Sequence, residues 1–108
     1  MKTHTESEEN YIKALYHLGG DQPVSNGDLA QRIGAKGSSV TQAVKRLGQK
    51  DLVNVVPYKG VQLTQQGIRL AKSILRKHRL WETFLVDKLG FGWDEVHPLA
   101  EQLEHIQS

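Results

Sequence analysis

Histidine and glutamate recur at helical spacing near the carboxyl end of this 108-residue sequence. His97, Glu101, Glu104 and His105 fall within about 100° of arc on a helix that turns about 100° per residue. The apolar residues of the same segment fall on the opposite side of that helix. Imidazole and carboxylate groups suit divalent first-row metals. The spacing therefore predicts a helix with one face for a core and one face for a metal ion.

His78 and Glu82 form a second pair at the same spacing, one turn apart, on the preceding expected helix. If the two helices pack antiparallel across a turn at residues 90–92, this pair can face His97 and Glu101 and enclose one ion. Glu104 and His105 lie further along and are expected to form a second site with the N-terminal helix. A single His/Glu pair is more often an ordinary surface ion pair. Its recurrence on two consecutive helices favours metal binding.

The composition limits which metal and which kind of protein the sequence describes. It contains no cysteine, which excludes disulfides and thiolate zinc sites. The donor set suits Mn, Fe(II), Co, Ni or Zn, and its many oxygens favour Mn or Fe(II). The N-terminus is polar and acidic, unlike a signal peptide, and no apolar run has the length of a membrane span. We therefore expect a cytoplasmic protein with no membrane partner.

Charge is strongly segregated along the chain, although the net charge is only +2. Residues 1–28 carry a net −3, residues 29–80 carry eleven Lys and Arg against one Asp for +10, and residues 81–108 carry −5. A basic middle segment favours a polyanion as partner. The acidic ends are expected to attract a cation.

The apolar pattern predicts a mainly helical fold with a small β-hairpin. Helices are expected at residues 7–18, 25–33, 37–51, 65–89 and 94–107, with the hairpin at 52–63. The two short helices joined at residues 34–37 are typical of a helix-turn-helix, and the hairpin that follows makes it a winged one. We predict a winged DNA-binding domain at residues 1–63. The start of a helical metal-binding and dimerisation domain is predicted at residues 64–108.

The second helix of the helix-turn-helix is expected to enter the major groove with its N-terminal residues leading. Small hydroxyl residues there allow close approach to phosphates, and Gln42 can both donate to and accept from a base edge. Basic side chains on this helix and at the wing tip are expected to contact phosphates. The predicted DNA-binding residues are Lys36, Ser38, Ser39, Thr41, Gln42, Lys45, Arg46, Lys50 and Lys59.

Five segments together resemble one known family: ENYIKALY, SSVTQAVKRL, YKGVQLTQQG, RKHRLWE and VHPLAEQLEH. The chain is similar over essentially its whole length to the metal-dependent repressors typified by the diphtheria toxin repressor and the manganese transport regulators. The resemblance implies a winged helix that binds operator DNA as a dimer when Fe(II) or Mn(II) is bound. Family members continue into further dimerisation helices, so we expect this chain to be a fragment of a longer protein.

Carried over by position, the resemblance implies two metal sites. His78, Glu82 and His97 would form one, and the other would consist of Glu101, Glu104, His105 and Asn10. This assignment moves Glu101 away from His97, where spacing alone had placed it. Glu101 matches the manganese-type members. Asn10 and Lys13 match neither the iron type nor the manganese type, although Asn10 still offers an amide oxygen.

Together, these patterns predict a metal-responsive repressor of metal-uptake genes that acts as a homodimer and has no small-molecule substrate. One alternative is a winged-helix transcription factor without metal control, in which the His/Glu pairs are solvated surface. Another is a carboxylate–histidine metalloenzyme. Di-iron bundles need a Glu-x-x-His motif on two helices, whereas this sequence offers only a related Glu-x-x-Glu-His run at residues 101–105 on one helix, so we predict that the protein is not an enzyme.

Overall fold

The computed structural model describes residues 4–106, which form the predicted mainly helical fold with one β-hairpin. In chain order the elements are α1 (Glu6–Gly19), α2 (Asn26–Ile33), α3 (Gly37–Gln49), β1 (Val53–Val56), β2 (Gly60–Leu63), α4 (Gln65–Leu89) and α5 (Trp93–Leu103). No helix within the described range is both long and apolar enough to cross a membrane.

The chain divides inside α4 into an N-terminal unit of residues 4–71 and a C-terminal unit of residues 72–106. Residues 65–71 of α4 belong to the N-terminal unit, and Thr64 fastens the start of the helix there. The Thr64 hydroxyl donates to the Asp51 carbonyl at 2.7 Å and accepts the Gly67 amide at 3.0 Å. A Cβ at Gly67 would lie 2.2 Å from the Leu52 carbonyl oxygen, so glycine permits this close approach.

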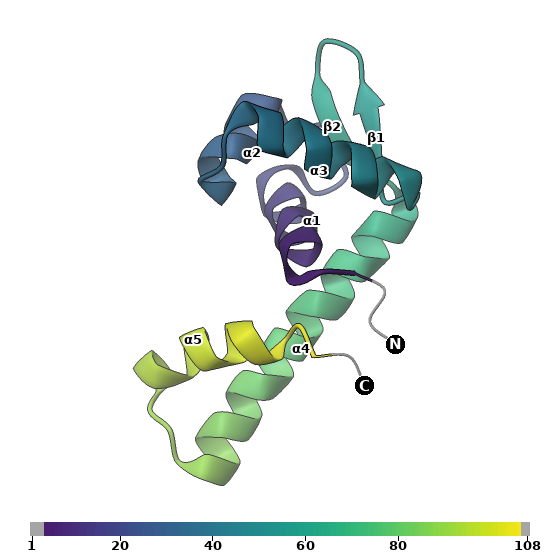
Figure 1. Cartoon of the computed structure of the whole chain (residues 1–108). Coiled ribbons are helices and arrows are strands. Elements are labelled where there is room, and N and C mark those ends of the chain that lie inside the picture. Colours follow the sequence, from purple (N-terminus) through teal and green to yellow (C-terminus); the bar gives the residue numbers. More distant parts are fainter. Residues whose placement is uncertain (1–3, 107–108) are drawn as a thin grey trace. The chain divides into compact units, whose positions relative to one another are not determined.

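In the N-terminal unit α1 contacts α2, α3 and β2 (Figure 1). Each helix turns its apolar face inward, as its spacing predicts. The largest fully buried apolar side chains of this core are Ile12, Leu15, Leu29, Val40, Leu47 and Val61. Burying such side chains contributes about 1.5–3 kcal/mol each before conformational entropy is counted. This core fixes the direction of α3, whose outer face carries the predicted DNA contacts.

The hairpin is anchored by a short backbone bridge to the segment before α2. β1 and β2 pair antiparallel, with Val53 opposite Leu63 and Val56 opposite Gly60. The Val24 amide donates to the Val61 carbonyl at 2.7 Å, and the Val61 amide donates back at 2.8 Å. A Cβ at Gly60, where φ is +124°, would lie 2.0 Å from the Val24 carbonyl oxygen. Only glycine fits at position 60, so the bridge to Val24 requires a glycine where β2 begins.

The C-terminal unit consists of most of α4, a turn at residues 90–92, and α5. Gly90 has φ +72°, and the Gly92 amide donates to the Glu95 carboxylate at 3.0 Å at the start of α5. The apolar pattern predicts that the last helix runs to residue 107, which lies outside the described residues, but α5 ends at Leu103. Glu104 is the C-cap, and its amide donates to the Ala100 carbonyl at 2.8 Å. Glu104 and His105 therefore follow the helix instead of continuing its stripe.

One ion pair joins the first turn of α1 to the end of α3. The Glu8 carboxylate accepts the Thr5 amide at 2.9 Å and pairs with the Lys50 ammonium at 3.0 Å. Burial by itself raises the pKa of Glu8, but the Thr5 and Lys50 interactions outweigh it and hold the pKa of this carboxyl below its ordinary value. Ionised Glu8 therefore stabilises the packing of α1 against α3.

Glu8→Gln should lower the free energy of unfolding by about 1–2 kcal/mol near neutral pH, since it removes a charged hydrogen-bond acceptor. Because folding lowers the pKa of Glu8, the advantage of the parent protein is complete above the ordinary glutamate value. It is lost as the pH falls through the lowered value. Urea unfolding of both proteins across this acidic range, with a chelator present, measures the difference. Glu6→Gln, an exposed glutamate of the same turn, is the matched control, and an equal loss in that variant would contradict the prediction.

Candidate functional site

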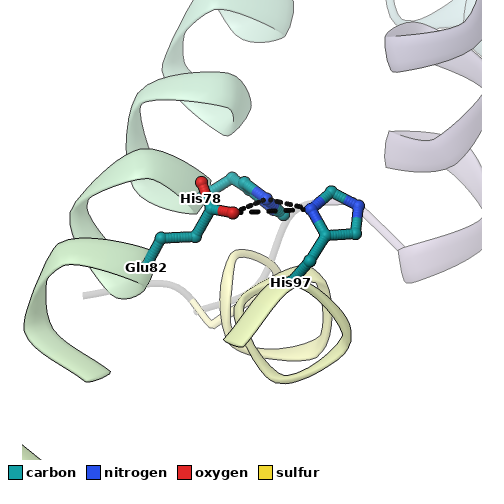
Figure 2. Close-up of side chains that lie close together, drawn as sticks. All are labelled: His78, Glu82 and His97. Carbon is teal, nitrogen blue, oxygen red and sulfur yellow. Dashed lines mark hydrogen bonds and ion pairs between the residues drawn. The ribbon is translucent and has the colours of Figure 1, made fainter. Parts of the chain in front are cut away.

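Three side chains from two helices bring their donor atoms together in the C-terminal unit. Figure 2 shows His78 and Glu82 reaching from α4 towards His97 on α5. The Nε2 atom of His78 lies 3.1 Å from Nδ1 of His97 and 3.3 Å from a carboxylate oxygen of Glu82. That same oxygen lies 3.4 Å from Nδ1 of His97. The three donors therefore form a nearly equilateral triangle.

This triangle has the dimensions that a single metal ion requires. Nitrogen and oxygen ligands lie about 2.0–2.2 Å from a zinc ion, and other first-row ions are similar. Two such ligands at octahedral or tetrahedral angles lie about 3.0–3.5 Å from each other. The observed separations of 3.1, 3.3 and 3.4 Å fall in this range. The donor set therefore fits a divalent first-row metal without rearrangement.

The helices place these donors for simple geometric reasons. His78 and Glu82 are one turn apart on α4, so both project from the same side. On α5, Val96 and Ala100 are fully buried, while His97 lies between them in sequence and has a side chain that is 65% exposed. The side chains of His78 and Glu82 are only 14% and 23% exposed. The triangle is thus backed by α4 and open to an incoming ion on its His97 side.

A fourth residue, Glu104, orients the first histidine. The Nδ1 atom of His78 lies 2.6 Å from a Glu104 carboxylate oxygen. A proton on Nδ1, donated to this carboxylate, leaves the lone pair of Nε2 directed at Glu82 and His97. Metal-binding histidines usually carry such a carboxylate or carbonyl on the other ring nitrogen, which fixes the ring and strengthens the ligand. No sequence spacing indicated this contact, because it joins α4 to the residue after α5.

The remaining predicted ligands are arranged differently. A Glu101 oxygen lies 3.7 Å from Nε2 of His97, the ring nitrogen that is not part of the triangle. The second Glu104 oxygen lies 3.8 Å from Nε2 of His105. Glu104 thus links the His78 ring to His105. Asn10 lies on α1 in the N-terminal unit. A second metal set of Glu101, Glu104, His105 and Asn10 therefore stays a prediction.

The predicted DNA-binding residues share one property, which is that every one is exposed. Eight lie on or directly beside α3, and Lys59 lies in the turn of the hairpin. α3 begins at Gly37 with no side-chain cap, so the hydroxyls of Ser38 and Ser39 lie inside its first turn. Lys50 differs from the others because its ammonium already pairs with Glu8 at 3.0 Å.

An open groove of about 720 Å³ separates α3 from the hairpin. Thr41 and Lys45 line it from α3, Lys59 and Tyr58 from the turn, and Ser25 from the start of α2. Hydroxyl and ammonium groups therefore lie beside an otherwise largely apolar channel bounded by the helix and the wing. Such a lining suits a sugar–phosphate strand.

Two family models match the chain in consecutive order. The model for the iron dependent repressor N-terminal DNA binding domain matches residues 3–61. The model for the iron dependent repressor metal binding and dimerisation domain matches residues 64–108.

Individual relatives agree with these matches. The chain is 36% identical to the iron-dependent repressor IdeR of Mycobacterium tuberculosis over its full length, which covers 47% of that protein. It is also 36% identical to an uncharacterized HTH-type transcriptional regulator of Methanocaldococcus jannaschii, with 96% of this chain and 85% of that one aligned. A solved manganese-dependent transcriptional repressor in complex with manganese is 40% identical, with a TM-score of 0.75 over 94% of this chain and 47% of that one.

The chain thus spans about half the length of the first of these relatives and most of the length of the second. The named repressors among them are regulators of transcription and not enzymes. Because the DNA-binding and metal-binding family models together cover nearly every residue, the chain belongs to the iron-dependent repressor family.

Proposed function

We propose that this protein is a metal-responsive transcriptional repressor of metal-uptake genes that binds operator DNA as a homodimer when loaded with Fe(II) or Mn(II). The observation that carries the proposal is the triangle of His78, Glu82 and His97. It lies in the same chain as a winged helix whose predicted DNA contacts are all exposed. Dimerisation is supported by the family description of residues 64–108. The repressor would act in the cytoplasm, where it would bind its operator DNA.

The donor chemistry supports iron or manganese as the ion. Two imidazoles and a carboxylate, in a sequence without cysteine, form a set of intermediate hardness that Fe(II) and Mn(II) accept. The names of the relatives point the same way, since one is an iron-dependent repressor and another was solved with manganese. A bound ion would supply positive charge beside Glu82. The protein itself contributes the fixed His78 ring, held by Glu104 at 2.6 Å.

The winged helix would provide the DNA contacts. The first-turn amides of α3 carry the positive end of the helix dipole and can bind a phosphate. Lys45 and Arg46 on the exposed face of α3 would add phosphate contacts, and Gln42 would reach a base edge. Metal binding would favour the DNA-competent population, and operator DNA would in turn raise the metal affinity by the same factor.

Metal binding should stabilise the folded protein through the triangle. Adding Mn(II) anaerobically to chelator-treated protein, to about a hundred times the dissociation constant, should raise the free energy of unfolding by about 2.7 kcal/mol. His78→Ala and His97→Ala should each abolish the rise, which thermal unfolding with and without metal would measure. His17→Ala, a histidine on α1, is the matched control and should keep the full rise. Equal stabilisation of all four proteins would show that the ion binds elsewhere.

DNA binding should require metal and depend strongly on salt. An operator duplex can be selected from a pool with randomised centres, and its affinity then measured over a range of salt concentrations. Lys45→Ala should weaken binding and reduce the slope of log affinity against log salt by about 0.9, because one phosphate contact is lost.

Gln42→Ala should relax the preference for one base at a cost of about 1–3 kcal/mol.

Lys88→Ala, at the end of α4, removes the same charge outside the winged helix and should leave the slope unchanged. Binding that is equally tight in Mn(II) and in chelator would instead identify a winged-helix factor without metal control.

A further inference from the structure

The tip of the hairpin has an unfavourable residue in a demanding backbone position. The Lys59 amide donates to the Val56 carbonyl at 3.0 Å, which closes a four-residue turn with Pro57 in its second position. Tyr58, the third residue, has φ +67°. Proline followed by a residue of positive φ is the pattern of a type II turn, where glycine or asparagine normally occupies that third position. A bulky residue in this region is strained.

The tyrosine ring gains nothing within the described part of the chain that would offset this strain. Its side chain is as exposed as in an extended peptide, with a relative exposure of 109%. The next residue but one, Gly60, shows that the hairpin uses glycine where the backbone requires it. Strained positions that persist without local compensation tend to mark functional contacts. An exposed ring held in a strained turn therefore points to a contact outside this chain.

The surroundings of Tyr58 indicate the chemistry of that contact. It lines the groove between α3 and the hairpin together with Lys45, Lys59 and Thr41. Five valines and Pro57 make much of this lining apolar, and its charged groups are the two ammonium groups, which lie in the segment of residues 29–80 that carries +10. Tyrosine hydroxyls and lysines are common partners of DNA phosphates and sugars. Since both charged residues of the lining are lysines and none is acidic, the charge of the groove favours a nucleic-acid strand, whose sugars can lie against the apolar part of the lining.

We propose that Tyr58 contacts the sugar–phosphate backbone of the operator duplex, with its hydroxyl on a phosphate and its ring against the sugars, beside the strand that passes between α3 and the wing. The proposal rests on the proposed function, since it requires that the protein binds DNA. The strained turn would then hold the Tyr58 ring in position to contact the DNA. Stability and DNA affinity should then respond to the same substitution in opposite directions.

Tyr58→Gly tests this opposition because glycine adopts positive φ without strain. The thermal midpoint of the variant should rise by about 2–4 °C. Its affinity for the selected duplex in Mn(II) should fall roughly tenfold, as expected for the loss of one charge-assisted hydrogen bond. Asp51→Gly is the matched control, because Asp51 has φ +60° and is also exposed but follows α3 outside the hairpin. It should raise the midpoint without weakening DNA binding.

Each outcome decides between the possibilities. A lower affinity with an equal or higher midpoint, found in Tyr58→Gly and not in Asp51→Gly, supports the contact. An unchanged affinity of Tyr58→Gly for a duplex that the parent protein binds overturns this inference alone. A lower midpoint in Tyr58→Gly overturns it as well, because the ring would then serve the fold. If the parent protein selects no duplex from the pool in Mn(II), the proposed function fails and the Tyr58 contact fails with it.

Discussion

Ring nitrogens of His78 and His97 lie 3.1 Å apart, and the fold of the C-terminal unit has to hold them at this short distance. Two imidazole nitrogens come this close only by a hydrogen bond or by sharing an ion, and Glu82 completes the arrangement needed for the second. One-turn spacing on α4, the turn at Gly90 and the burial of Val96 on α5 all serve this approach. A hydrogen bond from Nδ1 of His78 to Glu104 would leave Nε2 as the ring nitrogen that faces an ion.

The N-terminal unit meets a different requirement, which is to hold α3 and the hairpin firmly while their outer faces stay free. Glu8 and Lys50 tie α1 to the end of α3, and Thr64 joins the start of α4 to the backbone that follows α3. Val24 fixes the hairpin by its bridge to Val61. Each of these contacts uses polar groups at the ends of elements. The exposed residues of α3 can therefore contact a partner without disturbing the core.

Much of this arrangement could be predicted from local patterns. The apolar periodicity predicted every helix and the hairpin. Spacing alone placed His78 and Glu82 opposite His97 and Glu101, and the family resemblance then gave the set of three without Glu101. The contact of Glu104 with His78 could not be predicted, because it depends on where α5 ends and how the chain turns after Leu103. Lys50 was expected on the DNA side from its charge alone, but its partner Glu8 is 42 residues away in sequence. The positive φ of Tyr58 could not be predicted either, because the sequence indicates a turn there but not its backbone conformation.

We propose that His78 and His97 are direct ligands of one ion. Pulsed EPR of the Mn(II)-loaded protein with isotopically labelled histidine tests this directly, because hyperfine coupling to nitrogen reports only on bound imidazoles. We expect coupling to histidine nitrogens from two rings, with the coupling of one ring lost in His97→Ala and that of the other lost in His78→Ala. A spectrum without directly bound histidine nitrogen, or one that neither substitution changes, would contradict the assignment of the triangle as the metal site.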